Sequence, residues 1–447
     1  ADDVTIDTAQ VMAEPTIPIP TALNSVTIGK TATTKGILYI SPPDDASTTR
    51  TESEDITLDG GQLYLGFAYK HRVVNFAGAS TVNSASEIRV QGHGNASTQP
   101  RGTVSGSISG TGQLDLLGTQ SARVTLSGNN SGHSGGMLVN MPNRVELSGD
   151  GSAGTGPLTV NTTLYVNADQ TGTVATPSSV GVSNGAKLRV NNRYNGISVA
   201  ATDWDVTMEA NSQLQFGNTA TGKLDGTGSL TVNGDVTVYM SQDGRWSATG
   251  EIGVPISGSS NILVQFPNAN DSQQGQDWTR LILSADNSGF SGDIRLDVVA
   301  VQADPMTNIV RGAAPNSLGS NNSVIVDADA ELEITDPAAG NGTNIVYLLA
   351  GSAGLLDLQE DFTVLGLNLG GTYNDVLGEV EGGKGIAPDT YTEATFAADY
   401  PGYIDYIDFA TDITTLEVLT GPSAAIPEPA GLSLIGLAVL SLRKKRS

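Results

Sequence analysis

The chain has 447 residues, including 54 glycines and no cysteine, and its 47 acidic and 22 basic side chains give a formal charge of −25 at pH 7. The lack of cysteine excludes disulfides, thiolate metal sites and cysteine nucleophiles, and the negative charge argues against nucleic-acid partners. Only 5% of the residues are aromatic and 15% are charged, so apolar area must be buried in thin, repeated layers, which favours many short strands.

The N-terminal segment, residues 1–50, is rich in Pro, Thr and Asp. We expect an extended arm or a cap there, because such a composition buries little apolar area. The chain begins with Ala1 rather than methionine, which suggests that a secretory signal peptide has been removed.

Residues 51–344 consist of short stretches in which apolar and polar residues alternate, such as "SEDITLDG", "NRVELSG" and "GPLTVNTTLYVNAD". Gly, Asn, Asp or Ser interrupts the alternation about every eight to twelve residues, which predicts strands joined by tight turns. The spacing fits both a β-sandwich and a β-solenoid.

An internal repeat favours the solenoid. "VTLSGNNSGHSGGMLVN" at residues 124–140 returns as "LILSADNSGFSGDIRLD" at residues 281–297, and the coils of a solenoid must offer their neighbours the same shape. The shared turn positions are Gly128, Asn130, Gly135, Asn287 and Gly292.

These stretches resemble the autotransporter-associated β-strand repeat, which begins with Gly-Thr-Gly and continues through a Leu-Ser-Gly-x-Asn turn. The pattern fits Gly110–Gly112 with the first turn, and Gly226–Gly228 with a second, distorted copy in which Ala285 replaces the turn glycine. The resemblance implies a right-handed parallel β-helix. It does not imply an autotransporter, because too few residues follow the last coil for a membrane barrel.

Few residues suggest chemistry. His71, His93 and His133 lack metal-ligand spacing, and we expect surface residues. Phe290 stands where the first copy has His133, so the fold does not require an imidazole. The sequence singles out no catalytic residue and no metal ligand, although Ca²⁺ binding remains an alternative for the acidic clusters.

Two groups of residues keep a binding or catalytic alternative open. Asp243, Arg245 and Trp246 combine an aromatic platform with hydrogen-bonding groups, as sugar sites do. Acids in "DADAELEITD" and at Asp399, Asp405, Asp408 and Asp412 are spaced so that alternation places several along one strand face. We expect solvated strand faces, with Ca²⁺ sites or glycosidase acids as alternatives.

Residues 345–425 change in spacing and gain aromatics, so we expect a terminal β cap that covers the last coil. Residues 426–447 contain Pro427, Glu428 and Pro429, then the apolar stretch from Ala430 to Leu442, and then a basic cluster made of Arg443, Lys444, Lys445 and Arg446. Thirteen helical residues span about 20 Å, which makes a marginal membrane helix, and the basic cluster predicts that the body lies on the periplasmic side.

This tail resembles the PEP-CTERM sorting signal of Gram-negative bacteria, which a membrane protease called exosortase processes. The resemblance implies export by the general secretion machinery, transient membrane association, cleavage near Pro427–Pro429, and delivery to the cell surface or the extracellular matrix. Exosortase, extracellular polysaccharide and neighbouring surface proteins are the implied partners.

The sequence therefore predicts a non-enzymatic, secreted surface or matrix protein, built as a parallel β-helix with a C-terminal β cap and a short C-terminal hydrophobic helix. A polysaccharide lyase or hydrolase on the same scaffold and a glycan-binding adhesin remain as alternatives.

Overall fold

The structure is a computed structural model, and it describes most of the chain. The described residues are 3–7, 10–13, 25–31, 34–40, 49–66, 73–90, 101–119, 121–148, 153–166, 177–191, 199–217, 221–241, 248–266, 278–298, 307–350, 355–411 and 414–421.

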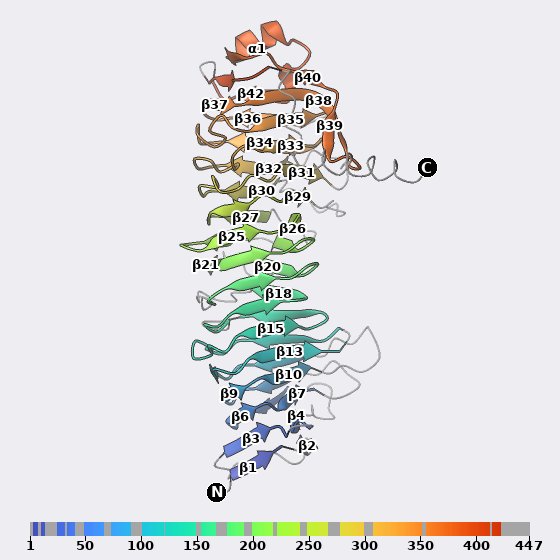
Figure 1. Cartoon of the computed structure of the whole chain (residues 1–447), viewed down its shortest axis with the longest axis vertical. Helices are drawn as coiled ribbons and strands as arrows, with labels where there is room; N and C mark the ends of the chain where they lie inside the picture. Colours follow the sequence, from blue (N-terminus) through green and yellow to red (C-terminus); the bar gives the residue numbers. More distant parts are fainter. Residues whose placement is uncertain are drawn as a thin grey trace, which may run out of the picture.

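The described strands stack into one elongated column with the N-terminal coils at one end and the last coils at the other (Figure 1). Short alternating segments suit this arrangement, because one side of each strand faces the core and its edges pair with the coils above and below. We number the sheets I to V.

Sheet I has five strands: β1 (Asp3–Ile6), β3 (Ser25–Gly29), β6 (Ile56–Asp59), β9 (Ser80–Ser84) and β12 (Ile108–Gly110). Sheet II has eleven: β2 (Gln10–Ala13), β4 (Ile37–Ile40), β7 (Gln62–Leu65), β10 (Ser86–Val90), β13 (Leu114–Gly118), β15 (Met137–Asn140), β17 (Leu158–Val160), β19 (Val180–Val182), β22 (Asp205–Met208), β25 (Ser229–Val232) and β28 (Ile256–Gly258).

Sheet III has sixteen strands: β5 (Arg50–Glu52), β8 (Val73–Phe76), β11 (Arg101–Val104), β14 (Arg123–Leu126), β16 (Arg144–Leu147), β18 (Thr163–Val166), β20 (Lys187–Asn191), β23 (Gln213–Gly217), β26 (Val236–Ser241), β29 (Ile262–Phe266), β31 (Ile294–Val298), β33 (Ser323–Val326), β35 (Ile345–Leu349), β38 (Gly366–Asn374), β39 (Glu379–Glu381) and β40 (Lys384–Gly385).

Sheet IV has eight strands: β21 (Val199–Thr202), β24 (Thr221–Asp225), β27 (Ala248–Ile252), β30 (Trp278–Leu283), β32 (Thr307–Gly312), β34 (Ala330–Ile334), β36 (Leu355–Leu358) and β42 (Ile407–Phe409). Sheet V has three: β37 (Phe362–Val364), β41 (Asp389–Tyr391) and β43 (Leu416–Val418).

The chain visits the sheets in an order that changes along the column. Near the N-terminus it passes through sheets I, II and III in each coil, as in β6, β7 and β8, and from β22 to β30 it passes through II, III and IV. The described strands alternate between sheets II and III from β13 to β20, and between III and IV from β31 to β36. Successive strands of sheets I, II and IV pair in parallel, as do those of sheet III from β5 to β38. The predicted all-β parallel solenoid is therefore confirmed.

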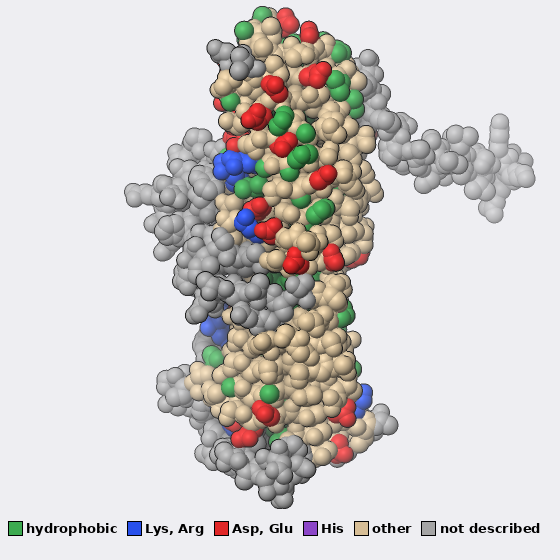
Figure 2. All heavy atoms as spheres, turned by 90° about the vertical axis from the view of Figure 1, so that its left-hand side faces the viewer, with side chains coloured by type: hydrophobic (Ala, Val, Ile, Leu, Met, Phe, Trp, Pro, Cys, Tyr) green, Lys and Arg blue, Asp and Glu red, His purple; other side chains and the backbone are tan. Residues whose placement is uncertain are grey.

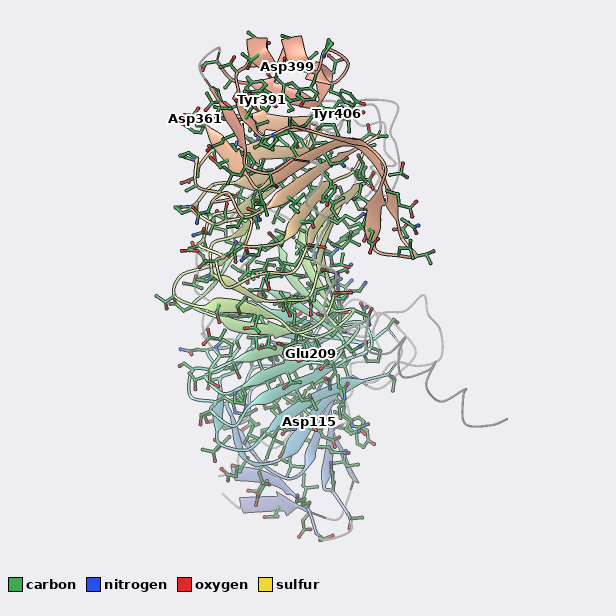
Figure 3. The ribbon with its side chains drawn as sticks, turned by 45° about the horizontal axis from the view of Figure 1, so that its top comes forward. Asp115, Glu209, Asp361, Tyr391, Asp399 and Tyr406 are labelled. Atoms are coloured by element: carbon green, nitrogen blue, oxygen red, sulfur yellow. The ribbon has the colours of Figure 1, made fainter. Side chains whose placement is uncertain are left out.

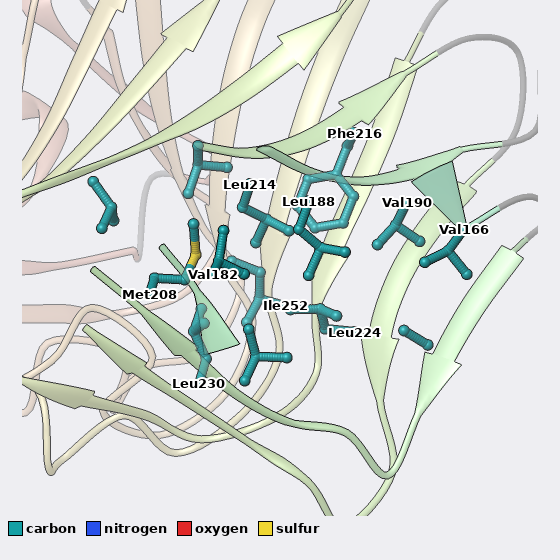
Figure 4. Packing of buried hydrophobic residues seen from close by; sticks show 14 of the residues in the cluster. Val166, Val182, Leu188, Val190, Met208, Leu214, Phe216, Leu224, Leu230 and Ile252 are labelled. Carbon is teal, nitrogen blue, oxygen red and sulfur yellow. The ribbon is translucent and has the colours of Figure 1, made fainter. Parts of the chain in front are cut away.

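Alternation builds the core. In sheet III the buried residues Leu164, Leu188, Leu214 and Val238 are register partners on successive strands and form one apolar column. Leu188 and Leu214 are seen in Figure 4 among the side chains of neighbouring coils. Each coil therefore buries only a few aliphatic side chains, which explains how so few aromatic residues suffice.

The stack begins before residue 51, the boundary that the sequence predicts. Strand β1 pairs in parallel with β3, and β2 pairs with β4, so the described part of residues 1–50 belongs to the solenoid rather than to an extended arm. The reason is local alternation: Val26 and Ile28 on β3 are buried, as are Leu38 and Ile40 on β4.

The C-terminal cap also starts later than residue 345, because β35 and β36 continue the parallel stack. Beyond them the pairing becomes partly antiparallel, between β38 and β39 and between β41 and β43. The cap contains helix α1 (Glu393–Asp399) and a 3-10 turn η1 (Ile404–Tyr406), which the sequence patterns did not predict.

Helix α1 is short and locally encoded. Thr392 and Thr395 form a capping box at its start, with Thr392 Oγ1 accepting from Thr395 N and Thr395 Oγ1 accepting from Thr392 N. Phe396 is its buried residue, and its ring packs edge-on against Tyr391 at 5.6 Å between centroids. An isolated helical turn of this length needs such tertiary contacts to form.

Candidate functional site: two repeated turns and an acidic column

The repeated stretches form two equivalent turns. Each one bridges to the coil below, between Gly110 and His133 in the first turn and between Gly258 and Phe290 in the second. Both bridging glycines have positive φ, 105° and 120°, a region that other residues rarely adopt.

A buried asparagine organises each turn. Asn130 Oδ1 accepts from the backbone N–H of Ile108 at 2.8 Å, and Asn287 Oδ1 accepts from that of Ile256 at 2.8 Å. Asn287 Nδ2 also donates to the carbonyl of Ser317 at 2.7 Å. Both asparagines are almost fully buried, so these bonds satisfy groups that water cannot reach.

The turn glycines mark places where two coils touch. A Cβ at Gly135 would lie 2.1 Å from the carbonyl oxygen of Gly112, and one at Gly292 would lie 2.0 Å from that of Ser260. A Cβ at Gly128 would lie 2.0 Å from the carbonyl oxygen of Gly106. The predicted turn residues are thus architectural, because they set the distance between coils.

The structure corrects the pairing of the second copy. Gly258–Ser260, and not Gly226–Gly228, corresponds to Gly110–Gly112, since Gly258 N donates to Gly289 O at 3.2 Å as Gly110 N donates to Gly132 O at 3.1 Å. Gly226–Gly228 lies between β24 and β25, one coil earlier. The second copy is therefore less distorted than the sequence suggested.

The second copy is also displaced by one sheet. In the first copy, β12, β13 and β14 belong to sheets I, II and III, whereas in the second, β28, β29 and β30 belong to sheets II, III and IV. Two segments of similar sequence therefore occupy the column in positions that differ by one side of a coil.

His133 contradicts the expectation of a surface histidine. Its side chain is buried, with 1% of the residue exposed, and Nε2 lies 3.0 Å from the carbonyl oxygen of Gly136. Burial is the main cause that lowers the pKa of His133, partly offset by hydrogen bonds to backbone carbonyls. Phe290, its counterpart, is fully buried, so both side chains fill the same space in their turns.

Sheet IV aligns some of the predicted acidic residues with Asp357, which the sequence did not single out. On its outward side, register partners run Lys223, Glu251, Ile282, Arg311, Glu333, Asp357 and Asp408. Charges are balanced up to Glu333, which Arg311 binds with two hydrogen bonds of 2.7 and 2.8 Å. In the described part of this column, Asp357 and Asp408 follow with no further cation. We call Glu331, Glu333, Asp357 and Asp408 the acidic column.

Two members of the acidic column, Glu331 and Asp357, have a raised pKa. Burial, and then the nearby charges of Asp357, Glu333 and Asp408, raise the pKa of Glu331 to about 7, whereas Arg280 acts in the opposite direction. Burial is also the largest cause that raises the pKa of Asp357, although Gln359 donates to its carboxylate at 2.7 and 2.9 Å. A carboxyl group that titrates near neutrality can exchange protons with a bound ligand.

The acids predicted near the C-terminus do not all join this column. Asp408 lies on β42, but Asp399 ends α1, Asp405 lies in η1, and Asp412 is outside the described residues. Figure 3 places Asp399 with Asp361, Tyr391 and Tyr406 at the C-terminal end of the molecule, away from Asp115 and Glu209. In Figure 2, acidic side chains are more frequent over the upper, C-terminal part of the face shown than over its lower part.

Several predicted sites fall outside the described residues: Asp243, Arg245 and Trp246, which follow β26, the histidines His71 and His93, and the whole tail from Pro427 to Arg446. Within the described ranges, no helix is long and apolar enough to cross a membrane, and no group of three or more His, Asp or Glu side chains could hold a metal ion.

Comparisons with known proteins add no relative. No protein-family model matches the chain, and searches of curated proteins and of solved structures give no match either.

Proposed function

We propose that the chain is an exported structural protein of the cell surface or extracellular matrix. The observation that carries this proposal is the continuous parallel stack of sheet III from β5 to β38, which supports a long and rigid rod. Such a rod suits spacing and display, because each coil depends mainly on its two neighbours and adds a further strip of outward side chains.

The tail supports export. Pro427, Glu428 and Pro429, the apolar stretch and the terminal basic cluster follow the order of the PEP-CTERM signal. The excess of acidic residues suits a hydrated exterior that does not adhere to anionic lipid.

Localisation tests this proposal. The precursor is expressed in a bacterium that has an exosortase, and the cells are separated into cytoplasmic, membrane and surface or matrix fractions. We expect the mature protein in the surface or matrix fraction without its tail, and the variant P427A/E428A/P429A in the membrane fraction with its tail. S423A, just outside the motif, is the matched control. Equal distribution of the triple variant and the parent would contradict the sorting step.

The acidic column favours one alternative, a polysaccharide lyase or hydrolase. Its support is the pKa of Glu331 near 7 beside Arg280 and Asp357, since polysaccharide-cleaving sites use a carboxyl group of raised pKa. The parent and E331Q are incubated with acidic and neutral polysaccharides. Cleavage that E331Q abolishes would replace the structural proposal with the enzymatic one; we expect no cleavage.

A further inference from the structure

A basic face interrupts the acidic surface of this protein. It lies on the outward side of sheet III across β11, β14, β16, β18 and β20, and its cations are Arg101, Arg123, Arg144, Lys187 and Arg189. Among the described outward side chains of these five strands, Glu146 is the one carboxylate. The excess of cations is notable in a chain of net charge −25.

The cations form an ordered column. Arg101 pairs in register with Arg123, and Arg123 pairs with Arg144, so three guanidinium groups occupy adjacent coils about 4.8 Å apart. Like charges directly opposite each other on neighbouring strands are destabilising unless an anion lies between them. Lys187 continues the same line two strands after Arg144, with Thr163 as its register partner.

Glu146 balances only part of this charge. Its Oε1 lies 2.5 Å from Arg144 Nε and 3.9 Å from Arg123 Nη1, and Thr125 donates to its Oε2 at 3.2 Å. Arg101 and Lys187 are exposed and flank this pair at the two ends, and among the described residues Glu146 forms its ion pairs with Arg123 and Arg144 alone. One carboxylate therefore serves the centre of the column, and within the described part of the chain no acidic side chain is paired with the cations at its two ends.

Tyr165 fixes the neighbouring arginines. The guanidinium carbons of Arg144 and Arg189 lie 4.8 and 5.0 Å from the centre of its ring, and Arg189 Nη1 donates to its hydroxyl at 3.3 Å. Stacking of this kind holds planar cations in place and lowers the entropy lost when they bind a ligand.

The neutral neighbours suit a sugar more than a nucleic acid. Thr103, Thr125, Gln213 and Gln215 stand beside the cations on the same face and offer hydroxyl and amide groups. Two arginines, Arg144 and Arg189, already lie over the ring of Tyr165, which leaves less of it available for base stacking. The overall negative charge repels a dense phosphate backbone more strongly than a polymer with sparser charges.

We infer that the basic face binds an acidic polysaccharide, with the carboxylates of successive sugar units meeting the column of Arg101, Arg123, Arg144 and Lys187. The strand spacing of about 4.8 Å is close to the length of one sugar ring, so a glycan chain aligned with the column meets a new cation at nearly every unit. The biological setting of this inference rests on the proposed matrix role.

The test uses the purified full-length chain and three probes: polygalacturonate, neutral dextran and double-stranded DNA. The variant R101Q/R123Q/K187Q removes three cations but keeps the Arg144–Glu146 pair, and K30Q/K384Q removes two exposed cations from other parts of the surface. We expect the parent to bind polygalacturonate but not dextran, and the triple variant to bind at least about tenfold more weakly, whereas the control changes less than about twofold. Circular dichroism checks that all variants fold.

A second variant gives a change in the opposite direction. E146Q removes the one carboxylate of the face and should tighten polygalacturonate binding about threefold and steepen its salt dependence. Equal affinities of the parent, R101Q/R123Q/K187Q and K30Q/K384Q would overturn the inference. Tighter binding of DNA than of polygalacturonate, with the same loss in the triple variant, would also overturn it in favour of a general polyanion site.

The two proposals fail separately. A matrix protein whose affinity for polygalacturonate does not depend on the basic face would remove only this inference. A protein that binds through this face but stays in the cytoplasm would remove the proposed export instead.

Discussion

The two repeated turns show which features the solenoid preserves. Both keep the asparagine that accepts from a buried backbone N–H, the glycine bridge and the close contact between coils. They differ in the side chain at the centre, His133 in one and Phe290 in the other, and in the sheets they join. Backbone contacts between coils are thus the conserved part, and the buried ring serves mainly to fill volume.

Adding a methyl group at the closest contact should have the largest effect. We expect G135A and G292A each to lower the free energy of unfolding by about 3 kcal/mol or more, because the new Cβ would overlap a backbone oxygen that cannot move alone. Urea unfolding followed by circular dichroism measures this. G181A, where a Cβ meets nothing within 4 Å, is the control and should change stability little. If only one of the two substitutions lowered stability, the two contacts would not be equivalent.

Removing the side-chain amide of the turn asparagine should have the second-largest effect on stability. N130A and N287A should each lower the free energy of unfolding by about 2 kcal/mol, since each leaves a buried N–H without its acceptor. The same urea unfolding serves as the measurement, and N233A, which loses an exposed bond to Glu209, should cost much less. An effect as small as that of N233A would mean that water replaces the side chain.

Exchanging the central rings tests the difference between the turns. Because the pKa of folded His133 lies below its unfolded value of 6.5, the folded state binds fewer protons, and stability falls as the pH drops through 6.5 and below. We expect H133F to remove this loss and to stabilise the protein by about 1 kcal/mol near pH 5. Thermal unfolding at pH 5 and pH 8 measures it, and F290H should introduce the same acid sensitivity into the second turn. Identical pH profiles for parent and H133F would show that His133 does not titrate in its turn.

The acidic column should make stability depend on pH in the opposite direction to His133. We expect this to be the smallest of the four effects. The pKa of Glu331 is about 7 in the folded protein, against an ordinary value of 4.5. Its contribution to the free energy of unfolding is therefore complete below pH 4.5 and is lost as the pH rises through 7. Allowing for solvent screening, E331Q should stabilise the protein by about 1 kcal/mol at pH 8 and hardly at pH 5. Hydrogen exchange in β34 and β36 reports it. E251Q, which loses its salt bridge to Lys223, is the control and should not stabilise at either pH.

Much of the architecture could be predicted from local patterns. Alternation around residues such as Val145 and Leu164 gave the strands, and the matching turns around Asn130 and Asn287 gave the parallel solenoid. The burial of His133 could have been inferred from Phe290, since a side chain that phenylalanine replaces is often a packed one.

Other features depend on how the coils stack. Nothing in the alternation indicates which sheet a strand joins, so the pairing of Gly226–Gly228 with the second turn was wrong. The basic face left a signal in the segments "RGTV", "RVTL" and "RVEL", in which an arginine starts each strand, but the register that aligns Arg101, Arg123 and Arg144 comes from the stack. Helix α1 was missed because its capping threonines encode a single short segment without a repeating period.

The second copy of the repeat lies one sheet further round the column than the first, and this affects how such a chain can change length. A segment that fits equally well after rotation by one side can be duplicated or deleted without adding or removing a whole number of coils. An engineer who splices coils therefore has a second side of the column on which this turn can serve as a junction.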